Sequence, residues 1–368
     1  MRQNPHSSPL KRLLCLSLSA ALALSLTACD TGTPGQTGTP ESSAPGGTAG
    51  GSQTVEVTGP NTTNLSAQGK YYTDYATLED EQQAAKELSI EIASEGDVLL
   101  KNENNALPLS SDVKYITLFG MHSINLIPSG GGSAAGTLGN NGIEPSTLQL
   151  AMEKAGYVVN PKTLSLYETH QALGTTQNEL PVSYYDNAVI GTYGGYGDAA
   201  VVTLSRKGAE NSDLLTNNVP DHADEDEHAL QLDDNEKDLI RHVKQYFDTV
   251  IVLINSSNIM QIPDLAEPKT ADNLGVDAIL WVGNTGNNAI EAVGPILNGT
   301  VNPSGHTVDI WPTDFTKDPT FTNFSANTQN KDENGNRMDS FLYYEGEDTG
   351  YHTVEYREGI YMGYRYYE

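Results

Sequence analysis

The chain has 368 residues, of which 20 are lysine or arginine and 48 are aspartate or glutamate, so its formal net charge is −28. This charge repels phosphate backbones and anionic lipid headgroups, and no local basic patch offsets it, which argues against nucleic acid as a partner. The 37% of hydrophobic residues is enough for at least one large core and argues against disorder throughout.

The N-terminus has the pattern of an export signal. Three basic residues within the first twelve precede an apolar run from Leu13 to Leu26, and Leu-Thr-Ala-Cys, ending at Cys29, resembles the lipobox of bacterial lipoproteins. The run is shorter than the roughly 20 residues that span a bilayer, so it predicts a signal peptide over residues 1–28. We expect a lipid on Cys29 that anchors the chain at the extracellular face of the bacterial membrane. Because Cys15 would leave with the signal, no disulfide and no cysteine-based metal site is expected.

The next segment predicts a tether. Residues 29–70 are rich in Gly, Thr, Ser and Pro and contain few aliphatic residues. Such a segment cannot bury enough apolar surface to offset its loss of conformational entropy on ordering. We therefore expect it to be disordered and to hold the folded part away from the anchored surface.

Residues 75–312 alternate between short apolar runs and amphipathic patterns. The runs predict strands, the patterns predict helices, and β-branched runs between helices are typical of a mostly parallel sheet that is buried on both faces. The sequence therefore predicts an α/β sandwich followed by an irregular, Tyr-rich tail over residues 313–368. The expected strands are residues 98–100, 115–119, 157–159, 199–204, 249–254 and 277–282, and the expected helices are residues 78–94, 146–155, 233–247 and 288–297.

Several motifs for common chemistries are absent or ambiguous. The chain has neither a Gly-x-x-x-x-Gly-Lys-Ser/Thr phosphate loop nor a Gly-x-Ser-x-Gly nucleophile elbow. The segment Gly130–Gly136 fits either a turn or a loop that approaches a ligand closely. His222 and His228 lie in an acidic run whose spacing fixes no coordination geometry, so a solvated loop is favoured over a metal site.

The loop Ser205–Asp213 has a more specific position. It begins directly after the strand predicted at residues 199–204, at the edge where open α/β sheets bind ligands. Glu210 on this loop could act as a general acid whose pKa is set by burial and by its neighbours. From these nine residues alone, an ion pair between Arg206 and a loop carboxylate is the favoured interpretation.

Five further segments occur in one order along the chain, and together they resemble glycoside hydrolase family 3, which contains β-glucosidases and β-xylosidases. The resemblance covers about residues 75 to 368 and implies an α/β-sandwich domain. The segments are residues 95–109, residues 115–120 with Gly-Gly-Gly-Ser at 130–133, Ile-Leu-Trp-Val-Gly at 279–283, residues 301–307 with Trp-Pro at 311–312, and residues 356–367.

The resemblance implies roles for particular residues. The family's general acid/base glutamate commonly lies in a Ser-Arg-x-x-Gly-Glu-Gly-x-Asp loop, and Glu210 occupies that position. By the same resemblance, Arg206, Asp213 and Ser133 are expected to contact substrate, and no cofactor and no metal is expected. Ala and Asn flank Glu210 where the family usually has Gly, and His306 stands where Arg is usual.

The family's nucleophile is an aspartate on a separate barrel domain, commonly in a Ser-Asp-Trp setting that this chain lacks. By the resemblance we expect the N-terminal part of a reversed-order enzyme, in which a fibronectin type III-like domain and the barrel follow residue 368. The implied activity is retaining hydrolysis of terminal β-glycosidic bonds in an oligosaccharide or β-glycoside. The alternative is a lipid-anchored carbohydrate-binding protein or degenerate remnant without catalysis.

Overall fold

The computed structural model describes residues 74–131, 144–173, 179–208, 214–215, 219–224, 226–318, 321, 343–344, 347–348 and 358–367. These residues all belong to the second of two compact units, Thr58–Glu368. The predicted signal peptide, Cys29 and the tether over residues 29–70 lie outside the described residues.

A six-stranded sheet forms the centre of the described part, in the order β1-β6-β5-β4-β2-β3. All neighbouring strands are parallel except β1, which runs antiparallel to β6. The prediction of a mostly parallel α/β sheet is therefore confirmed. The strands are β1 Val98–Asn102, β2 Tyr115–Phe119, β3 Val158–Val159, β4 Ala199–Arg206, β5 Val250–Ser256 and β6 Ala278–Trp281.

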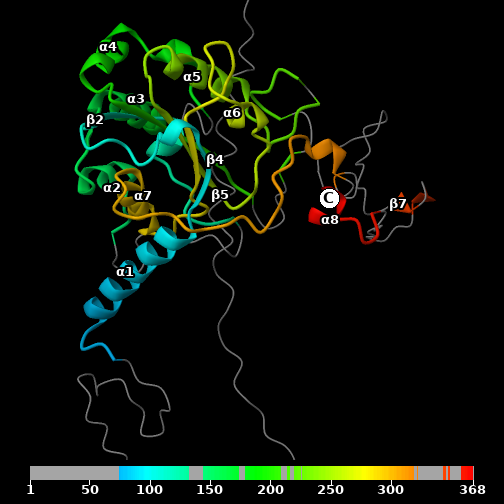
Figure 1. Ribbon diagram of the computed structural model, residues 1–368, viewed down its shortest axis with the longest axis horizontal. Coiled ribbons are helices and arrows are strands. Elements are labelled where there is room, and N and C mark those ends of the chain that lie inside the picture. Colours follow the sequence, from blue (N-terminus) through cyan, green and yellow to red (C-terminus); the bar gives the residue numbers. More distant parts are fainter. Residues whose placement is uncertain are drawn as a thin grey trace, which may run out of the picture. The chain divides into compact units, whose positions relative to one another are not determined.

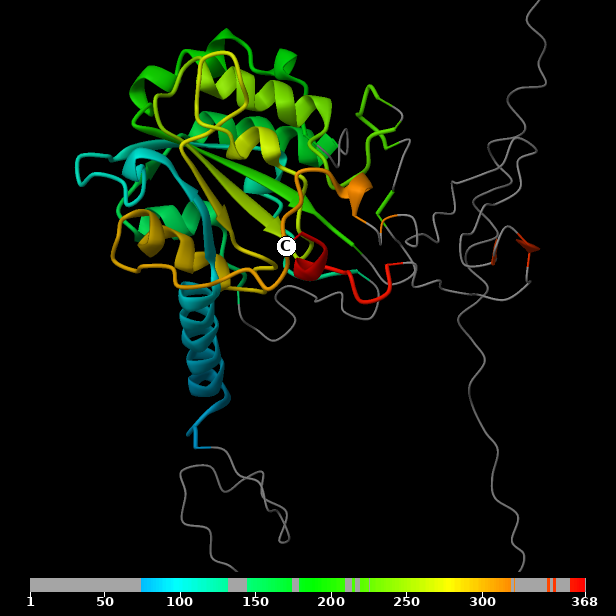
Figure 2. The same cartoon turned by 45° about the vertical axis from the view of Figure 1, so that its right-hand side comes forward.

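Helices cover both faces of this sheet (Figures 1 and 2). Apolar side chains of α4, α5 and α6 pack on one face, and those of α2 and α7 pack on the other. The buried strands read as continuous apolar runs because both faces are covered in this way. The helices are α1 Leu78–Gly96, α2 Leu148–Lys154, α3 Pro161–Leu173, α4 Asn187–Ile190, α5 Asp234–Lys244, α6 Pro263–Ala266, α7 Val293–Leu297 and α8 Tyr364–Tyr367.

The start of α5 shows how the sequence sets an element boundary. The Asp233 side chain accepts a hydrogen bond from the Glu236 backbone N–H at 2.7 Å, and the Glu236 carboxylate accepts one from the Asp233 N–H at 2.9 Å. This capping box satisfies two N–H groups that would otherwise lack partners at the helix start. Acidic residues therefore cap the start of the helix predicted over 233–247.

One predicted helix differs from the structure, and one observed helix was not predicted. The single helix predicted over 288–297 is a 3-10 helix, η8 Ala289–Ala292, that continues into the short helix α7. Helix α3 was not predicted, because only three of its residues, Thr163, Leu164 and Tyr167, are buried and they form a weak apolar stripe.

In the tail, the described residues form a two-stranded pair, β7 Tyr343–Tyr344 with β8 Glu347–Asp348, and the short helix α8. Within the described residues, no helix is both long and apolar enough to cross a membrane.

Candidate functional site

The carboxyl ends of β2, β4, β5 and β6 meet at one edge of the sheet, as parallel strands require. Asn255, buried near the end of β5, connects three segments at this edge. Its Oδ1 accepts a hydrogen bond from Ile127 N at 2.6 Å, and its Nδ2 donates to Ile127 O at 3.0 Å and to Gly283 O at 2.7 Å. The Ser205 hydroxyl donates to the same Oδ1 at 3.3 Å. This buried amide therefore fixes the loops after β2 and β6 against the end of β4.

The Gly-rich segment meets the start of the loop that carries Glu210. The N–H of Gly131 donates to Gly208 O at 3.0 Å. A side chain at Gly208 would come within 3.4 Å of Asn258 Oδ1, and one at Gly130 within 3.6 Å of Gly208 O. Two segments that the sequence singled out separately are thus brought together at the carboxyl edge, where backbone approaches backbone closely.

Arg206, the last residue of β4, has all five guanidinium N–H groups engaged by the protein. Two of them bind the two carboxylate oxygens of Glu236, each at 2.7 Å. The other three donate to backbone carbonyls of Ser205, Ala229 and Gln231. A guanidinium has five N–H donors in total, so the loop begins from a fixed anchor.

The groups behind this anchor have shifted pKa values. Burial raises the pKa of the Glu236 carboxyl, but the charge and hydrogen bonds of Arg206 outweigh burial and leave it below its usual value. Burial and then the negative charge of Glu236 raise the pKa of Asp233. Burial lowers the pKa of His122 at the end of β2, against a smaller opposite contribution from its hydrogen bond to Asn125 O. The candidate edge therefore rests on a buried charge pair beside a neutral histidine.

Glu179 is a further buried carboxyl near the end of β2. It accepts hydrogen bonds from Met121 N at 2.9 Å and from Leu180 N at 2.8 Å. Burial nevertheless raises its pKa to about 8, because the two N–H donors only partly offset the loss of hydration.

Of the four residues predicted to act in catalysis or to contact substrate, the structure describes only Arg206. Glu210, Asp213 and Ser133 lie outside the described residues, so their roles stay predictions. Arg206 is described, and its role in contacting substrate also stays a prediction. Arg206 forms an ion pair with Glu236, thirty residues along the chain, whereas the loop carboxylates of the pair favoured from sequence lie outside the described residues.

The acidic run that carries His222 and His228 is described except for residue 225. Asp224 and Asp226 are exposed, as a solvated loop requires, whereas both histidine side chains are buried. His222 pairs with Glu227 at 2.8 Å. In the described part of the chain, no group of three or more His, Cys, Asp or Glu side chains could hold a metal ion.

Sequence reasoning missed two residues that organise this edge, Glu236 and Asn255. Glu236 lies near the start of the helix predicted over 233–247, and nothing in the local sequence indicates that its carboxylate also holds Arg206. Asn255 carried a weaker signal, a polar residue at the end of a continuous apolar run.

The fold places the chain in the class of α/β sandwiches, in which helices cover both faces of a mostly parallel sheet. Residues 97–364 match the family model described as "Glycosyl hydrolase family 3 C-terminal domain". The chain belongs to glycosyl hydrolase family 3.

Several relatives of the chain are named as β-glucosidases. The chain is 28% identical over 306 residues to "Beta-glucosidase A" of Butyrivibrio fibrisolvens, an alignment covering 77% of this chain and 32% of the relative. It is 24% identical over 294 residues to "Thermostable beta-glucosidase B" of Acetivibrio thermocellus, covering 78% of this chain and 31% of the relative. The chain thus spans about a third of the length of these curated relatives.

A similar solved structure is beta-glucosidase 3B from Thermotoga neapolitana in complex with glucose. It shares 27% sequence identity with a TM-score of 0.58, and the match covers 80% of this chain and 37% of that one. The likeness confirms the α/β-sandwich fold independently of the family model.

Proposed function

We propose that this chain supplies the acid/base carboxyl, Glu210, of a retaining β-glucosidase-like enzyme. Membership of the family, relatives named as β-glucosidases and the position of the Glu210 loop directly after β4 support this assignment. The observation that carries it furthest is the hydrogen bond from Gly131 N to Gly208 O. This hydrogen bond brings the Gly-rich segment and the Glu210 loop to one edge of the sheet. Two loops that contact the same sugar must lie close together in this way.

In the proposed mechanism a barrel aspartate attacks the anomeric carbon while Glu210 protonates the departing glycosidic oxygen. Glu210, now a carboxylate, then takes a proton from the water that displaces the aspartate and frees the sugar. Acid and base roles in one residue require a carboxyl held in place through both steps. The engaged guanidinium of Arg206 offers such a fixed starting point for the loop.

The proposal is tested by Glu210→Ala in the complete enzyme. We expect cleavage of an alkyl β-glucoside to slow by roughly 10²–10⁴-fold, the usual contribution of general acid catalysis. A dinitrophenyl glycoside should lose less in the glycosylation step, because its leaving group needs little protonation. Added azide should yield a β-glycosyl azide, since an anionic nucleophile needs no general base.

Glu168→Ala, at an exposed position on α3, is the matched control and should leave both rates unchanged. Equal loss on both substrates with no azide product would remove Glu210 from the acid/base role. Carbohydrate binding without any turnover in the complete protein would favour the non-catalytic alternative.

We also propose that the chain is exported and held at the outer face of the bacterial membrane by a lipid on Cys29. Support comes from the order of basic residues, apolar run and Leu-Thr-Ala-Cys at the N-terminus. The tether predicted over 29–70 would then give the folded domain reach toward soluble β-glycosides.

A further inference from the structure

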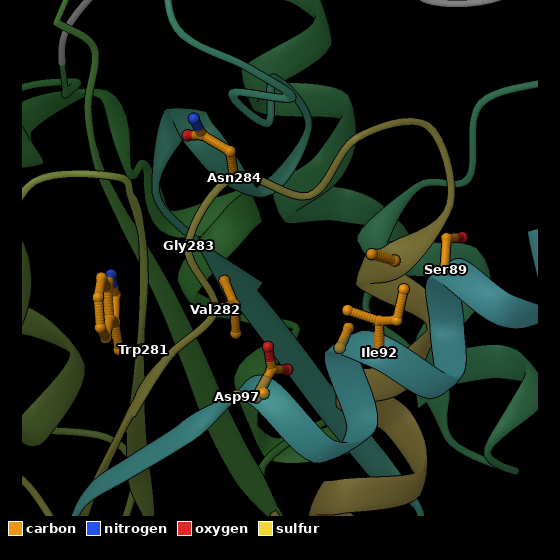
Figure 3. Close-up of a pocket in the computed structure, with 10 residues that line it drawn as sticks. Ser89, Ile92, Asp97, Trp281, Val282, Gly283 and Asn284 are labelled. Atoms are coloured by element: carbon orange, nitrogen blue, oxygen red, sulfur yellow. The ribbon is translucent and has the colours of Figure 1, made fainter. Parts of the chain in front are cut away.

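A cavity of about 230 Å³ lies between the last turn of α1 and the end of β6 (Figure 3). Its walls are mostly apolar and include Ile92, Ala93 and Val282. The ring of Trp281 is directed away from it and packs on the core of the opposite face of the sheet. Asp97, the residue that follows α1, also lines it. Figure 3 shows the Asp97 carboxyl directed from the helix end toward this hollow.

The Asp97 carboxyl is a buried group with no partner of its own. The residue is 5% exposed, and its backbone is engaged: its N–H donates to Ala93 O at 2.8 Å and its carbonyl accepts from Gly305 N at 3.2 Å. Within the described part of the chain, no hydrogen bond or ion pair reaches its carboxyl oxygens. Burial raises its pKa to about 8. A buried carboxyl without a partner is costly, which favours a ligand that would compensate it.

The end of α1 adds negative potential at the same place. The carbonyls of a helix's last turn carry a partial negative charge that favours cations, and the last turn of this helix contains no basic residue. Ionisable groups on the surrounding elements supply no counter-charge. Glu291 of η8 is paired with Lys86 and Lys154, and Glu95 and His306 are exposed.

We propose that this cavity binds a small aliphatic primary amine in its ammonium form. The Asp97 carboxylate is the counter-ion, and Ile92 and Val282 contact the alkyl part. One carboxylate in an apolar cavity suits an ammonium group better than a metal ion, because Ca²⁺ and Mg²⁺ require several oxygen ligands. The site is independent of the function proposed for Glu210.

The test is calorimetric titration of the full chain with n-butylammonium chloride, using n-butanol as a neutral ligand of similar shape. At pH 7 the carboxyl of the free protein is mostly protonated, so binding should release nearly one proton and the measured enthalpy should depend on the buffer's ionisation enthalpy. At pH 9 that dependence should vanish. Affinity for the ammonium should rise roughly 10- to 100-fold between pH 6 and pH 9, because the carboxyl no longer has to lose a proton.

Asp97→Asn keeps the side-chain shape and should weaken ammonium binding at least about tenfold, since a charge-assisted hydrogen bond is lost. Glu95→Gln removes an exposed carboxylate two residues away and should leave binding unchanged. Equal affinity for n-butanol, unchanged binding in Asp97→Asn, or an affinity that does not rise with pH would each overturn the proposal. The pH series uses the unmodified chain, so it decides the question even where a variant folds poorly.

Discussion

The contact between Arg206 and Glu236 joins the end of β4 to the start of α5 through two parallel hydrogen bonds. Both side chains are largely buried, so loss of one charge leaves the other without compensation. We expect Glu236→Gln to lower the free energy of unfolding by about 3–5 kcal/mol, as measured by urea unfolding. Glutamine is also compatible with the capping box, so the loss reports mainly on the charge.

Asp238→Asn is the matched control on the same helix. Asp238 and Arg241 form an ion pair at 2.7 Å, but their side chains are 53% and 55% exposed. Solvent screens such a pair, and its loss should change stability by less than about 1 kcal/mol. Equal destabilisation by the two substitutions would show that burial does not strengthen the Arg206 pair.

Asp97 gives the stability of the fold a pH dependence with a definite sign. Its pKa in the folded chain is about 8, above the value of roughly 3.9 for an unfolded aspartate. The folded state therefore retains a proton that the unfolded state releases, and stability falls as pH rises from about 4 to about 8. We expect Asp97→Asn to flatten this slope in urea unfolding measured between pH 5 and pH 9.

Part of the slope should persist in Asp97→Asn, because burial also raises the pKa of Glu179 to about 8. Glu95→Gln should keep the full slope of the unmodified chain. An Asp97→Asn variant with an unchanged slope would mean that the Asp97 carboxyl is ionised in the folded state at neutral pH.

At the scale of elements, burial explains which features of the fold can be predicted from sequence. Strands β4 and β5 are buried along nearly their whole length, so their apolar runs are continuous and their positions were predicted within two residues. The antiparallel direction of β1 depends on its pairing with β6, almost 180 residues away, and local sequence carries no signal of it. Helix α3 has many exposed polar residues and therefore lacked the buried apolar stripe that identified α5.

The contact between α2 and α7 depends on a glycine. A Cβ on Gly294 would lie 2.5 Å from Ala151 O and 2.7 Å from the Cβ of Ala155, so the helices would have to move apart. In an isolated helix alanine is more stable than glycine. Here the steric clash outweighs that preference, so the substitution should lower the stability of the fold. We expect Gly294→Ala to lower the free energy of unfolding by about 1–3 kcal/mol in urea unfolding.

Gly194→Ala tests whether that loss comes from the clash. Gly194 lies on an exposed turn, and a Cβ there would have no heavy atom within 4 Å. Its substitution should shift stability by no more than about 0.5 kcal/mol. A similar loss at both positions would indicate a backbone effect rather than close packing between α2 and α7.

At the scale of the whole molecule, the site combines segments that local patterns treat separately. The sequence singled out the Gly-rich segment and the Glu210 loop, and the structure joins them through Gly131 and Gly208. The sequence could not reveal that Asn255 ties the loops after β2 and β6 together, because both hydrogen-bond partners are far from Asn255 in the chain. Residue types and loop positions were therefore predictable, whereas the side chains that fix the loops were not.

The proposed lipid anchor is tested on the whole molecule by Cys29→Ala. If the thiol of Cys29 is the acylated group, the variant should leave the membrane fraction or accumulate as an unprocessed precursor. Fractionation with a radiolabelled fatty acid measures both outcomes, and Cys15→Ala, within the predicted signal peptide, is the control that should keep the label. Membrane association that persists in Cys29→Ala without any lipid label would rule out this anchor.

The contact between Trp281 and Trp311 gives the chain an optical property. These are its only two tryptophans, and their rings lie edge to face with centroids 5.5 Å apart. Emission excited at the red edge of the indole band therefore comes from this one corner of a 368-residue chain. Quenching or a spectral shift of that emission would report on this corner at the end of β6, while the 19 tyrosines, excited at shorter wavelength, report on the rest of the chain.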